Sequence, residues 1–447
     1  MIIMDSYKLI NKIKNINFID FLIRRNPIYY SYSIKLLNQL INYNYEERIK
    51  WTERQLKNII CVAQKNFKHL EKQEFCKWPI TDKDIINSNY FQFINRNFQI
   101  PIIAYTSGST GKPLKLYRSL KSVVFEQACL DLICRLQGLN PYKLKIAILR
   151  GNEVKPPDDN SLPYWKFVSG KKLVLSSYHL SFENIKHYYE ILLKFAPDCL
   201  MAYPSSLEML CKYLQQSKYI LNIPLIITSS EVLPDNVRDL AQKVLGCKVI
   251  DLYGQAERVA LAYSVKNNEY YFIPGYSYVE LGYHSSDDEA DFYEVIGTSL
   301  WNTKMFFIRY KTGDLIKVNK GTDKKQIDKI RYGLSPFKGI VGRKNDYILS
   351  PDGIRIIAIN NLFWNVDNVI RAQVIQDAID KIRILVIPAI GFNENNKKQI
   401  MVNARYKIPQ NISIKIQIVN KLEVNKQGKV PFIIRGPEVQ EFEKAKK

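Results

Sequence analysis

Features that mark membrane, secreted and metal-binding proteins are missing from this sequence of 447 residues. It holds no run of about 18 apolar residues, so a membrane-spanning helix is not expected. The apolar N-terminal stretch has no small-residue cleavage site and is interrupted by charged residues, namely Asp5, Lys8, Lys12, Lys14 and Asp20. These absences predict a cytoplasmic protein without a signal peptide.

Disulfide and zinc patterns are also absent. The seven cysteines form no Cys-x-x-Cys pair, and the four histidines give no zinc-ligand spacing. Scattered thiols are typical of proteins that fold in a reducing compartment.

Acidic residues are too few to balance the basic ones, because 43 Asp and Glu stand against 65 Lys and Arg, a net charge of +22. One interpretation is an anionic partner such as nucleic acid, anionic lipid or acidic polysaccharide. The other is compositional bias, since Lys, Asn, Ile and Tyr are all abundant and the lysines are spread along the chain. No standard nucleic-acid-binding signature is present, so we expect no nucleic-acid partner. Peripheral membrane contact stays open, and the sequence does not indicate the oligomeric state.

The order of apolar segments predicts an α/β protein. Residues 1–75 have helical spacing, and Thr81-Asp82-Lys83-Asp84 is typical of a helix cap. Farther along, short apolar strands alternate with helices, which indicates parallel strands joined by crossover helices. The predicted strands are 100–105, 144–149, 172–176, 199–203, 224–228 and 248–252, and the predicted helices are 122–136, 183–195, 206–216 and 235–245.

From residue 270 onward, the pattern of apolar and polar residues differs from that of the predicted parallel region. Residues 270–340 alternate aromatic and β-branched with polar residues, which indicates antiparallel strands and a barrel-like portion. A further module begins near Gly342-Arg343, with strands at 382–387 and 412–419. We therefore predict a large N-terminal domain of parallel α/β subdomains with a β-barrel-like portion, and a small, mobile α+β C-terminal domain. The expected divisions are a helical segment at 1–80, the large domain at 81–341 and the small domain at 342–447.

Small polar clusters follow four of the predicted strands. Because ligands gather at the carboxyl ends of parallel strands, we expect these clusters to form one site. They comprise residues 106–111, 203–206, 229–231 and 253–257. Tyr203 fits core packing as well as it fits this site.

The strongest motif is the glycine- and hydroxyl-rich stretch 105–115. Its backbone N–H groups and hydroxyls can hold phosphates, and Lys112 supplies positive charge. It is not a Walker loop, because Gly108 and Gly111 are three residues apart and Pro113 follows the lysine.

Thr106-Ser-Gly-Ser-Thr-Gly-Lys-Pro113 resembles the signature loop of the adenylate-forming superfamily, which includes acyl-CoA synthetases, luciferases and adenylation domains. Four further motifs resemble those of the family and follow in its order, at 251–257, 309–314, 342–346 and 425–431. The segments 202–207, 228–231 and 298–302 resemble the phenylacetate–CoA ligase branch. Within that branch, the helical N-terminus with Trp78-Pro79 is most similar to capsule-polysaccharide-associated ligases.

The resemblance assigns roles to individual residues. The β- and γ-phosphates of ATP would be held by Thr106, Ser107, Gly108, Ser109, Thr110, Gly111 and Lys112. Ser230 and Glu231 would border the adenine, with Tyr253 beside it and Gly254 and Gln255 in the same nucleotide-binding segment. Asp314 would accept hydrogen bonds from the ribose hydroxyls, with Arg343 close by. Glu257 would hold Mg²⁺, and Lys429 would bridge the carboxylate and the α-phosphate.

These roles suit the chemistry. When a carboxylate attacks an α-phosphate, anions come together, so a lysine and Mg²⁺ are needed to neutralise the developing charge. Two departures from the family pattern stand out. Ala256 replaces the usual threonine and removes a hydroxyl, and residues 257–280 hold no cysteine for the structural zinc site of some relatives.

The resemblance implies a ligase that converts a small carboxylic acid to its acyl-AMP and then transfers the acyl group, with coenzyme A as the expected acceptor and a sugar amine or hydroxyl as another. A second hypothesis is a non-catalytic nucleotide-binding protein, and the presence of both Glu257 and Lys429 argues against it. A third, a basic nucleic-acid-binding protein, rests on charge alone. The sequence does not name the acid.

Overall fold

The structure is a computed structural model of the whole chain. It describes residues 17–445 with the exception of 71, 97–98, 107–113, 153, 157–158, 287–288, 342–346, 357–358, 364–365, 367, 389–390, 420–421 and 424–431.

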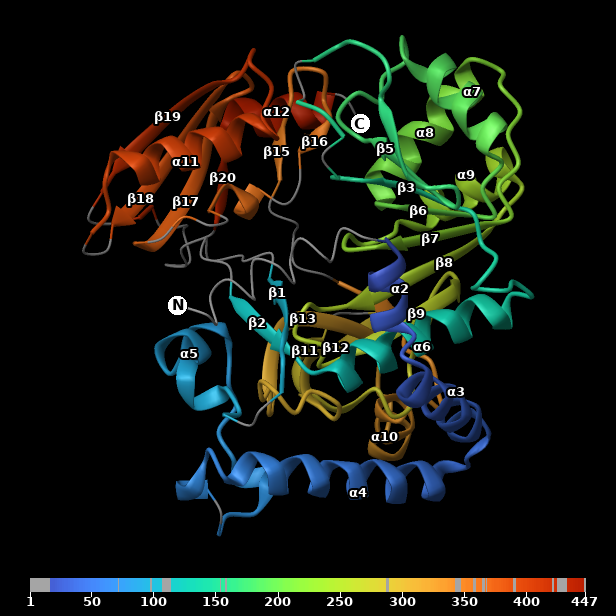
Figure 1. Ribbon diagram of the computed structural model, residues 1–447, viewed down its shortest axis with the longest axis vertical. Coiled ribbons are helices and arrows are strands. Elements are labelled where there is room, and N and C mark those ends of the chain that lie inside the picture. Colours follow the sequence, from blue (N-terminus) through green and yellow to red (C-terminus); the bar gives the residue numbers. More distant parts are fainter. Residues whose placement is uncertain are drawn as a thin grey trace.

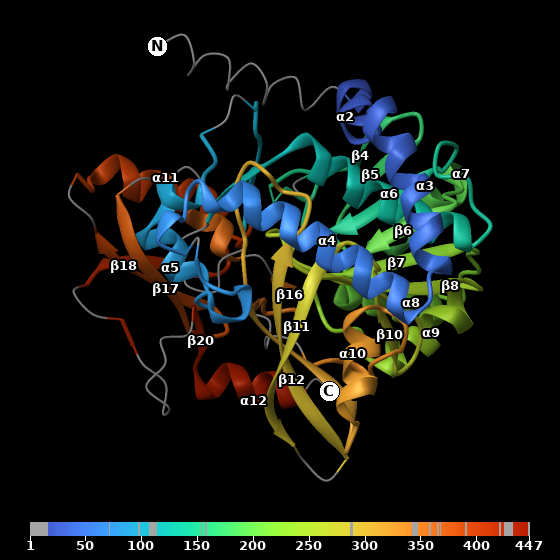
Figure 2. The ribbon, with the colours of Figure 1, turned by 90° about the horizontal axis from the view of Figure 1, so that it is seen from below.

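Three helices open the described chain: α2 (Asn17–Arg24), α3 (Pro27–Asn42) and α4 (Tyr45–Gln64). Asn26 caps α3 ahead of a proline in its first turn, and Asn44 forms a capping box with Glu47 at the start of α4. Helices α2 and α3 pack against α6 (Leu120–Leu136), while α4 contacts the strand β11 (Ser277–Ser286). Seen from below, α4 crosses the molecule beneath the sheet that contains β11 (Figure 2).

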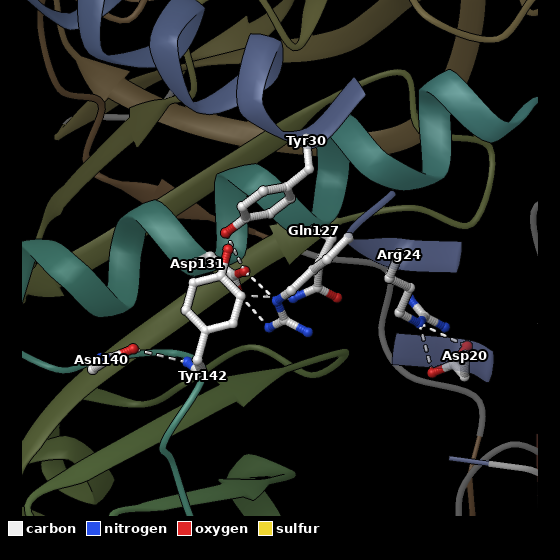
Figure 3. Close-up of polar contacts among 8 residues, drawn as sticks. Asp20, Arg24, Tyr30, Gln127, Asp131, Asn140 and Tyr142 are labelled. Atoms are coloured by element: carbon white, nitrogen blue, oxygen red, sulfur yellow. Dashed lines mark hydrogen bonds and ion pairs between the residues drawn. The ribbon is translucent and has the colours of Figure 1, made fainter. Parts of the chain in front are cut away.

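A buried carboxylate fastens these helices to α6. Asp131 accepts two hydrogen bonds of 2.7 Å from the Arg25 guanidinium, one of 2.6 Å from the Tyr30 hydroxyl and one of 2.8 Å from the Gln127 amide. Figure 3 shows Asp131 beside Tyr30 and Gln127, with the more exposed Asp20–Arg24 pair at one side. Burial, and then the neighbouring Asp131 carboxylate, raise the pKa of Tyr30 far above its ordinary value, so its hydroxyl stays a donor.

Replacing Asp131 with asparagine should lower the free energy of unfolding by about 3 kcal/mol, because it leaves the buried Arg25 charge without its counter-ion. The measurement is urea unfolding of both proteins. Asp20→Asn is the matched control, since its exposed pair should contribute less than about 1 kcal/mol. Equal losses in the two variants would contradict the anchoring role of Asp131.

The central sheet has eight strands in the order β10-β9-β8-β7-β6-β3-β5-β4. Its parallel part is built from β5 (Lys172–Ser176), β3 (Ile146–Arg150), β6 (Cys199–Ala202), β7 (Leu225–Ser229) and β8 (Lys248–Gly254). Antiparallel strands complete the edges: β4 (Trp165–Ser169), β9 (Leu261–Lys266) and β10 (Glu269–Phe272). Figure 1 shows the sheet with α7 (Ile185–Phe195), α8 (Pro204–Gln216) and α9 (Asp235–Leu245) along one face.

The predicted parallel strands and crossover helices are confirmed for residues 144–252, with one error before them. Strand β1 (Ile102–Tyr105) lies outside the central sheet and pairs antiparallel with β2 (Lys115–Arg118) in a sheet of two strands. Apolar composition predicted the strand but not its partner. Between the N-terminal helices and β1 lie α5 (Lys83–Ser88), capped by Asp82, and the short 3₁₀ helices η1 (Lys68–Leu70), η2 (Phe75–Lys77) and η3 (Tyr90–Phe93).

The antiparallel region is a sheet of four strands in the order β11-β12-β13-β14, with β12 at Ala290–Ser299, β13 at Tyr310–Asn319 and β14 at Gly339–Ile340. Helix α10 (Lys324–Arg331) packs on β10 and β11. Within the described residues this sheet does not close, so the barrel-like portion predicted from the sequence is an open sheet.

The small C-terminal domain is α+β, as predicted. Its sheet has the order β19-β18-β17-β20, with β17 (Val369–Ala378), β18 (Lys381–Pro388), β19 (Ser413–Ile418) and β20 (Ile433–Arg435). The remaining elements are β15 (Ile348–Leu349), β16 (Arg355–Ile356), η4 (Ile359–Phe363), α11 (Glu394–Arg405) and α12 (Pro437–Ala445).

The buried amide of Gln373 in β17 holds one turn of the C-terminal domain. Its Oε1 accepts a hydrogen bond from the Glu423 backbone N–H at 2.9 Å, and its Nε2 donates to the Glu423 carbonyl at 2.8 Å. The next residue, Val374, donates to the Phe432 carbonyl at 2.8 Å. Glu423 and Phe432 are therefore both attached to the same short stretch of β17.

Buried thiols make the core sensitive to alkali. Burial raises the pKa of Cys211 to about 12 and that of Cys134 to about 11, against an ordinary value of about 8.5. The folded state therefore keeps protons that the unfolded chain loses, and this stability is present below about pH 8.5 and lost as pH rises toward each folded pKa.

We expect the free energy of unfolding to fall steeply between about pH 9 and 12, by up to about 1.4 kcal/mol per pH unit for each such thiol. Cys211→Ala should flatten the slope, whereas Cys61→Ala, at an exposed position, should not. Urea unfolding at stepped pH measures both, and an unchanged slope in Cys211→Ala would rule out this contribution.

Candidate functional site

Three of the four predicted polar clusters meet at one edge of the central sheet. Strands β6, β7 and β8 are adjacent and parallel, so their carboxyl ends lie side by side. The clusters follow those ends, with Tyr203 leading into α8, Ser229-Ser230-Glu231 ending β7, and Gly254 ending β8. The convergence expected from the sequence is therefore confirmed for these three.

The turn after β7 is conformationally strained. Ser230 has φ of +73°, a left-handed conformation that costs a non-glycine residue of the order of 1 kcal/mol or more. Its hydroxyl lies 3.3 Å from that of Ser229. Such strain is concentrated at functional sites, which fits the prediction that Ser230 and Glu231 border a ligand.

The fourth cluster begins at Thr106, between β1 and β2. The Thr106 backbone N–H donates to the Leu114 carbonyl at 3.0 Å, and the Leu114 N–H donates to the Thr106 hydroxyl at 3.0 Å. These two bonds join the ends of the glycine-rich stretch. The predicted residues between them, Ser107 to Lys112, lie outside the described part of the chain, and no contact of Thr106 with the other clusters is seen.

A bulge in β13 presents Asp314. Glu294 pairs with Leu315 and Ile296 with Lys311, so one residue of β12 opposes three of β13. Gly313 has φ of +74°, which a glycine adopts without strain. The Thr312 hydroxyl donates to the Val295 carbonyl at 2.9 Å and accepts from the Asp314 N–H at 3.1 Å, which fixes the bulge.

Two tyrosine–carboxylate hydrogen bonds join this bulged strand to the end of β8. The Tyr253 hydroxyl donates to Asp314 Oδ2 at 3.0 Å, and the Tyr310 hydroxyl donates to Glu257 Oε1 at 2.7 Å. The bonds are reciprocal, because the tyrosine of each motif binds the terminal acid of the other. Segments about sixty residues apart in sequence thus form one unit.

The carboxylate of Glu257 suits a metal ion. Its side chain is buried, and its Oε2 accepts no hydrogen bond from any residue that the structure describes. Mg²⁺ is commonly held by one or two carboxylates together with substrate phosphates, so a single carboxylate at a phosphate site fits it. The described residues contain no cluster of three or more His, Cys, Asp or Glu that could hold a metal.

The turn between Gly254 and Arg258 carries an unpaired polar group. Both amide atoms of Gln255, Nε2 and Oε1, are buried without a hydrogen-bond partner among the residues that the structure describes. Buried polar groups are nearly always paired, so this amide fits a polar ligand placed against the turn. Arg118 holds the turn by donating to the Ala256 carbonyl at 2.6 Å, and Arg258 forms an ion pair with Glu126.

Comparison with known proteins was made by sequence and by structure. Residues 348–436 match the family described as the CapK C-terminal domain. The chain is 25% identical to Protein CapK of Staphylococcus aureus over 412 residues, which cover 90% of this chain and 89% of that protein. The chain is thus similar to CapK along nearly its whole length, and its C-terminal part matches the CapK C-terminal family model.

Two solved structures illustrate the likeness at lower identity. One is a 2-hydroxyisobutyryl-CoA ligase in complex with 2-HIB-AMP and CoA, 14% identical with a TM-score of 0.47, covering 90% of this chain and 92% of that one. Another is o-succinylbenzoate CoA synthetase of Bacillus subtilis, 15% identical with a TM-score of 0.38, covering 73% of this chain and 67% of that one.

Besides Ser107 to Lys112, the predicted site residues Arg343 and Lys429 also lie outside the described residues. Their roles stay predictions. Others were missed by sequence reasoning although they lie in or near quoted motifs. Tyr310 precedes the Lys-Thr-Gly-Asp sequence, and Asn302 uses its Oδ1 to accept the Ser119 N–H at 3.0 Å, which fixes the start of α6. Arg118, the last residue of β2, had no signal in the sequence.

Proposed function

We propose that the chain catalyses ATP-dependent activation of a carboxylic acid to an acyl-adenylate, releasing pyrophosphate, and then transfers the acyl group to an acceptor. The observation that carries this proposal is the reciprocal pair of hydrogen bonds, Tyr253 to Asp314 and Tyr310 to Glu257. This pair supports the proposal because it joins two carboxylates, one for the ribose hydroxyls and one for Mg²⁺ in our assignment, near the strained Ser230 turn.

In this proposal each residue has a separate task. Asp314, oriented by Tyr253, accepts hydrogen bonds from the ribose, and the Gln255 amide satisfies its polar atoms on the nucleotide. Glu257 holds Mg²⁺, whose chemistry is to neutralise charge on the phosphoryl oxygens. Ser230 and Glu231 border the adenine, while Thr106, Lys112 and the residues between them hold the β- and γ-phosphates.

The C-terminal domain would complete the site. We assign Lys429 to the carboxylate and α-phosphate during adenylation, and we place the boundary between the domains near Gly342-Arg343. We take coenzyme A as the acceptor and a cell-surface polysaccharide pathway as the setting, because the sequence resembles capsule-associated ligases. A cytoplasmic location is part of the same proposal. The described residues contain no helix able to cross a membrane.

The test is a pyrophosphate-exchange screen with ATP, Mg²⁺ and a panel of aromatic, fatty, hydroxy, amino and dicarboxylic acids. We expect exchange that depends on one class of acid, and AMP formation when coenzyme A is added. Binding of ATP without exchange for any acid would instead identify a non-catalytic nucleotide-binding protein. Salt-sensitive retention on DNA without ATP turnover would favour the nucleic-acid-binding hypothesis.

A further inference from the structure

Arg150, a half-buried arginine, lies next to the proposed nucleotide site and has no role in the proposed nucleotide binding. Arg150 is the last residue of β3, the neighbour of β6 on the side away from β7. Strand alternation places its side chain on the face opposite Leu149, which is fully buried beneath α7 and α8. Arg150 therefore faces the other side of the sheet, together with Ile148 and Ile146, at the edge where ligands of parallel strands gather.

Among the described residues, no acidic side chain forms an ion pair with the Arg150 guanidinium. Its Nε is buried without a hydrogen bond to any of those residues. Burial lowers its pKa, with Tyr203 as the main opposing influence. Buried charges in proteins are almost always paired, because an unpaired one loses its hydration without compensation.

The backbone brings this guanidinium close to Tyr203. A Cβ added to Gly151 would lie 3.6 Å from Tyr203 Cε2 and 3.3 Å from the Tyr178 hydroxyl, so both rings pack on the chain immediately after Arg150. The Ser177 hydroxyl donates to the Arg150 carbonyl at 3.1 Å and helps to fix this end of β3.

The order of strands divides the site into two halves. The nucleotide residues Ser230, Glu231 and Tyr253 follow β7 and β8, whereas Tyr203 and Arg150 end β6 and β3. With the nucleotide over β7 and β8, the remaining carboxyl ends are those next to Arg150. The acid substrate must approach the α-phosphate from that half.

We propose that Arg150 binds a second oxyanionic group on the acid substrate, so that the enzyme activates acids carrying a carboxylate or phosphate besides the reacting carboxylate. This inference rests on the proposed function and narrows its substrate class. A planar guanidinium forms paired, charge-assisted hydrogen bonds with carboxylate or phosphate. A neutral acid would leave the same buried charge unpaired.

The experiment compares butanoate, 4-hydroxybutanoate, succinate, glutarate and 3-phosphopropanoate in pyrophosphate exchange, using the full chain and its Arg150→Gln variant. We expect kcat/KM of the wild-type protein to be about 10- to 100-fold higher for a dianionic acid than for butanoate. Arg150→Gln should remove that preference, because kcat/KM for the dianionic acids falls to the value for butanoate. Comparing kcat/KM for succinate and glutarate with kcat/KM for 3-phosphopropanoate shows whether the bound oxyanion is a carboxylate or a phosphate.

Lys194→Gln is the matched control for the loss of one positive charge. Lys194 is exposed in the last turn of α7, which leads into the amino end of β6 and so lies at the opposite edge of the sheet. This variant should keep the preference. Melting temperature supplies a second measurement, and Arg150→Gln should melt at or above the wild-type temperature because it removes an unpaired buried charge.

The outcomes separate the two proposals. Exchange with butanoate that equals exchange with every dianionic acid, or a preference that survives in Arg150→Gln, overturns the assignment of Arg150 and leaves the proposed function intact. A fall of several degrees in melting temperature with the preference retained shows that Arg150 is structural. Absence of exchange with every acid overturns the proposed function, and this substrate assignment with it.

Discussion

Glu257→Gln is expected to reduce acid-dependent pyrophosphate exchange by two to three orders of magnitude, the loss typical when an electrostatic contact to the transition state is removed. Glutamine keeps the shape of the side chain, and its amide oxygen can still accept the hydrogen bond from Tyr310 that is now made at 2.7 Å. What is lost is the negative charge, and Mg²⁺ prefers anionic oxygen ligands. The measurement is the exchange rate as Mg²⁺ is titrated.

Tyr310→Phe separates the metal role of Glu257 from its packing role. It removes the hydrogen bond but keeps the carboxylate, so exchange should fall less than in Glu257→Gln at saturating Mg²⁺. Circular dichroism of both variants checks that the fold is intact. Near-normal exchange by Glu257→Gln at ordinary Mg²⁺ would remove this residue from the site.

Lys429→Ala should lose roughly two or more orders of magnitude in the same exchange reaction, because one ammonium over the attacking carboxylate and the α-phosphate stabilises the transition state by several kcal/mol. The variant should still convert a chemically prepared acyl-adenylate with the true acceptor, since resemblance to the superfamily implies that the second step uses another orientation of the C-terminal domain. Lys426→Ala, in the same segment of sequence, is the control and should leave both steps unchanged.

Two results would count against this role of Lys429. Wild-type exchange by Lys429→Ala would mean that the lysine is a solvated surface residue. Equal loss of both half-reactions would leave the domain rotation unsupported and point to misfolding.

The parallel core could be predicted because its signals are local. Strands β6, β7 and β8 are short apolar runs that end in small polar residues, and amphipathic helices follow two of them. The same runs could not specify pairing. The strand ending at Tyr105 has the composition of a sheet strand, yet its partner is β2, beyond the glycine-rich stretch. The closure of a barrel likewise depends on edges that no single segment encodes.

The features of the candidate site also differ in whether local sequence could predict them. Asp314 and Glu257 could be named because the short motifs that contain them resemble those of the adenylate-forming superfamily, in the same order along the chain. The pairing of Asp314 with Tyr253 and of Glu257 with Tyr310 could not be predicted, since each hydrogen bond joins residues more than fifty positions apart. Arg150 gave no signal at all, because an arginine at the end of a strand is normally solvated. What distinguishes it is a buried Nε without a hydrogen bond to the residues that the structure describes.

The attachment of Glu423 and Phe432 to neighbouring residues of β17 limits how far Lys429 can travel by itself. A chain that leaves and returns to almost the same place can extend only half its contour length, which for residues 424–431 is about 15 Å at roughly 3.4 Å per residue. Lys429 can therefore move only a short distance relative to the four-stranded C-terminal sheet, to which Glu423 and Phe432 are attached. Any larger movement of Lys429 requires the whole sheet to move. The rate of the catalytic cycle would then depend on the motion of the C-terminal domain and not on that of residues 424–431 alone.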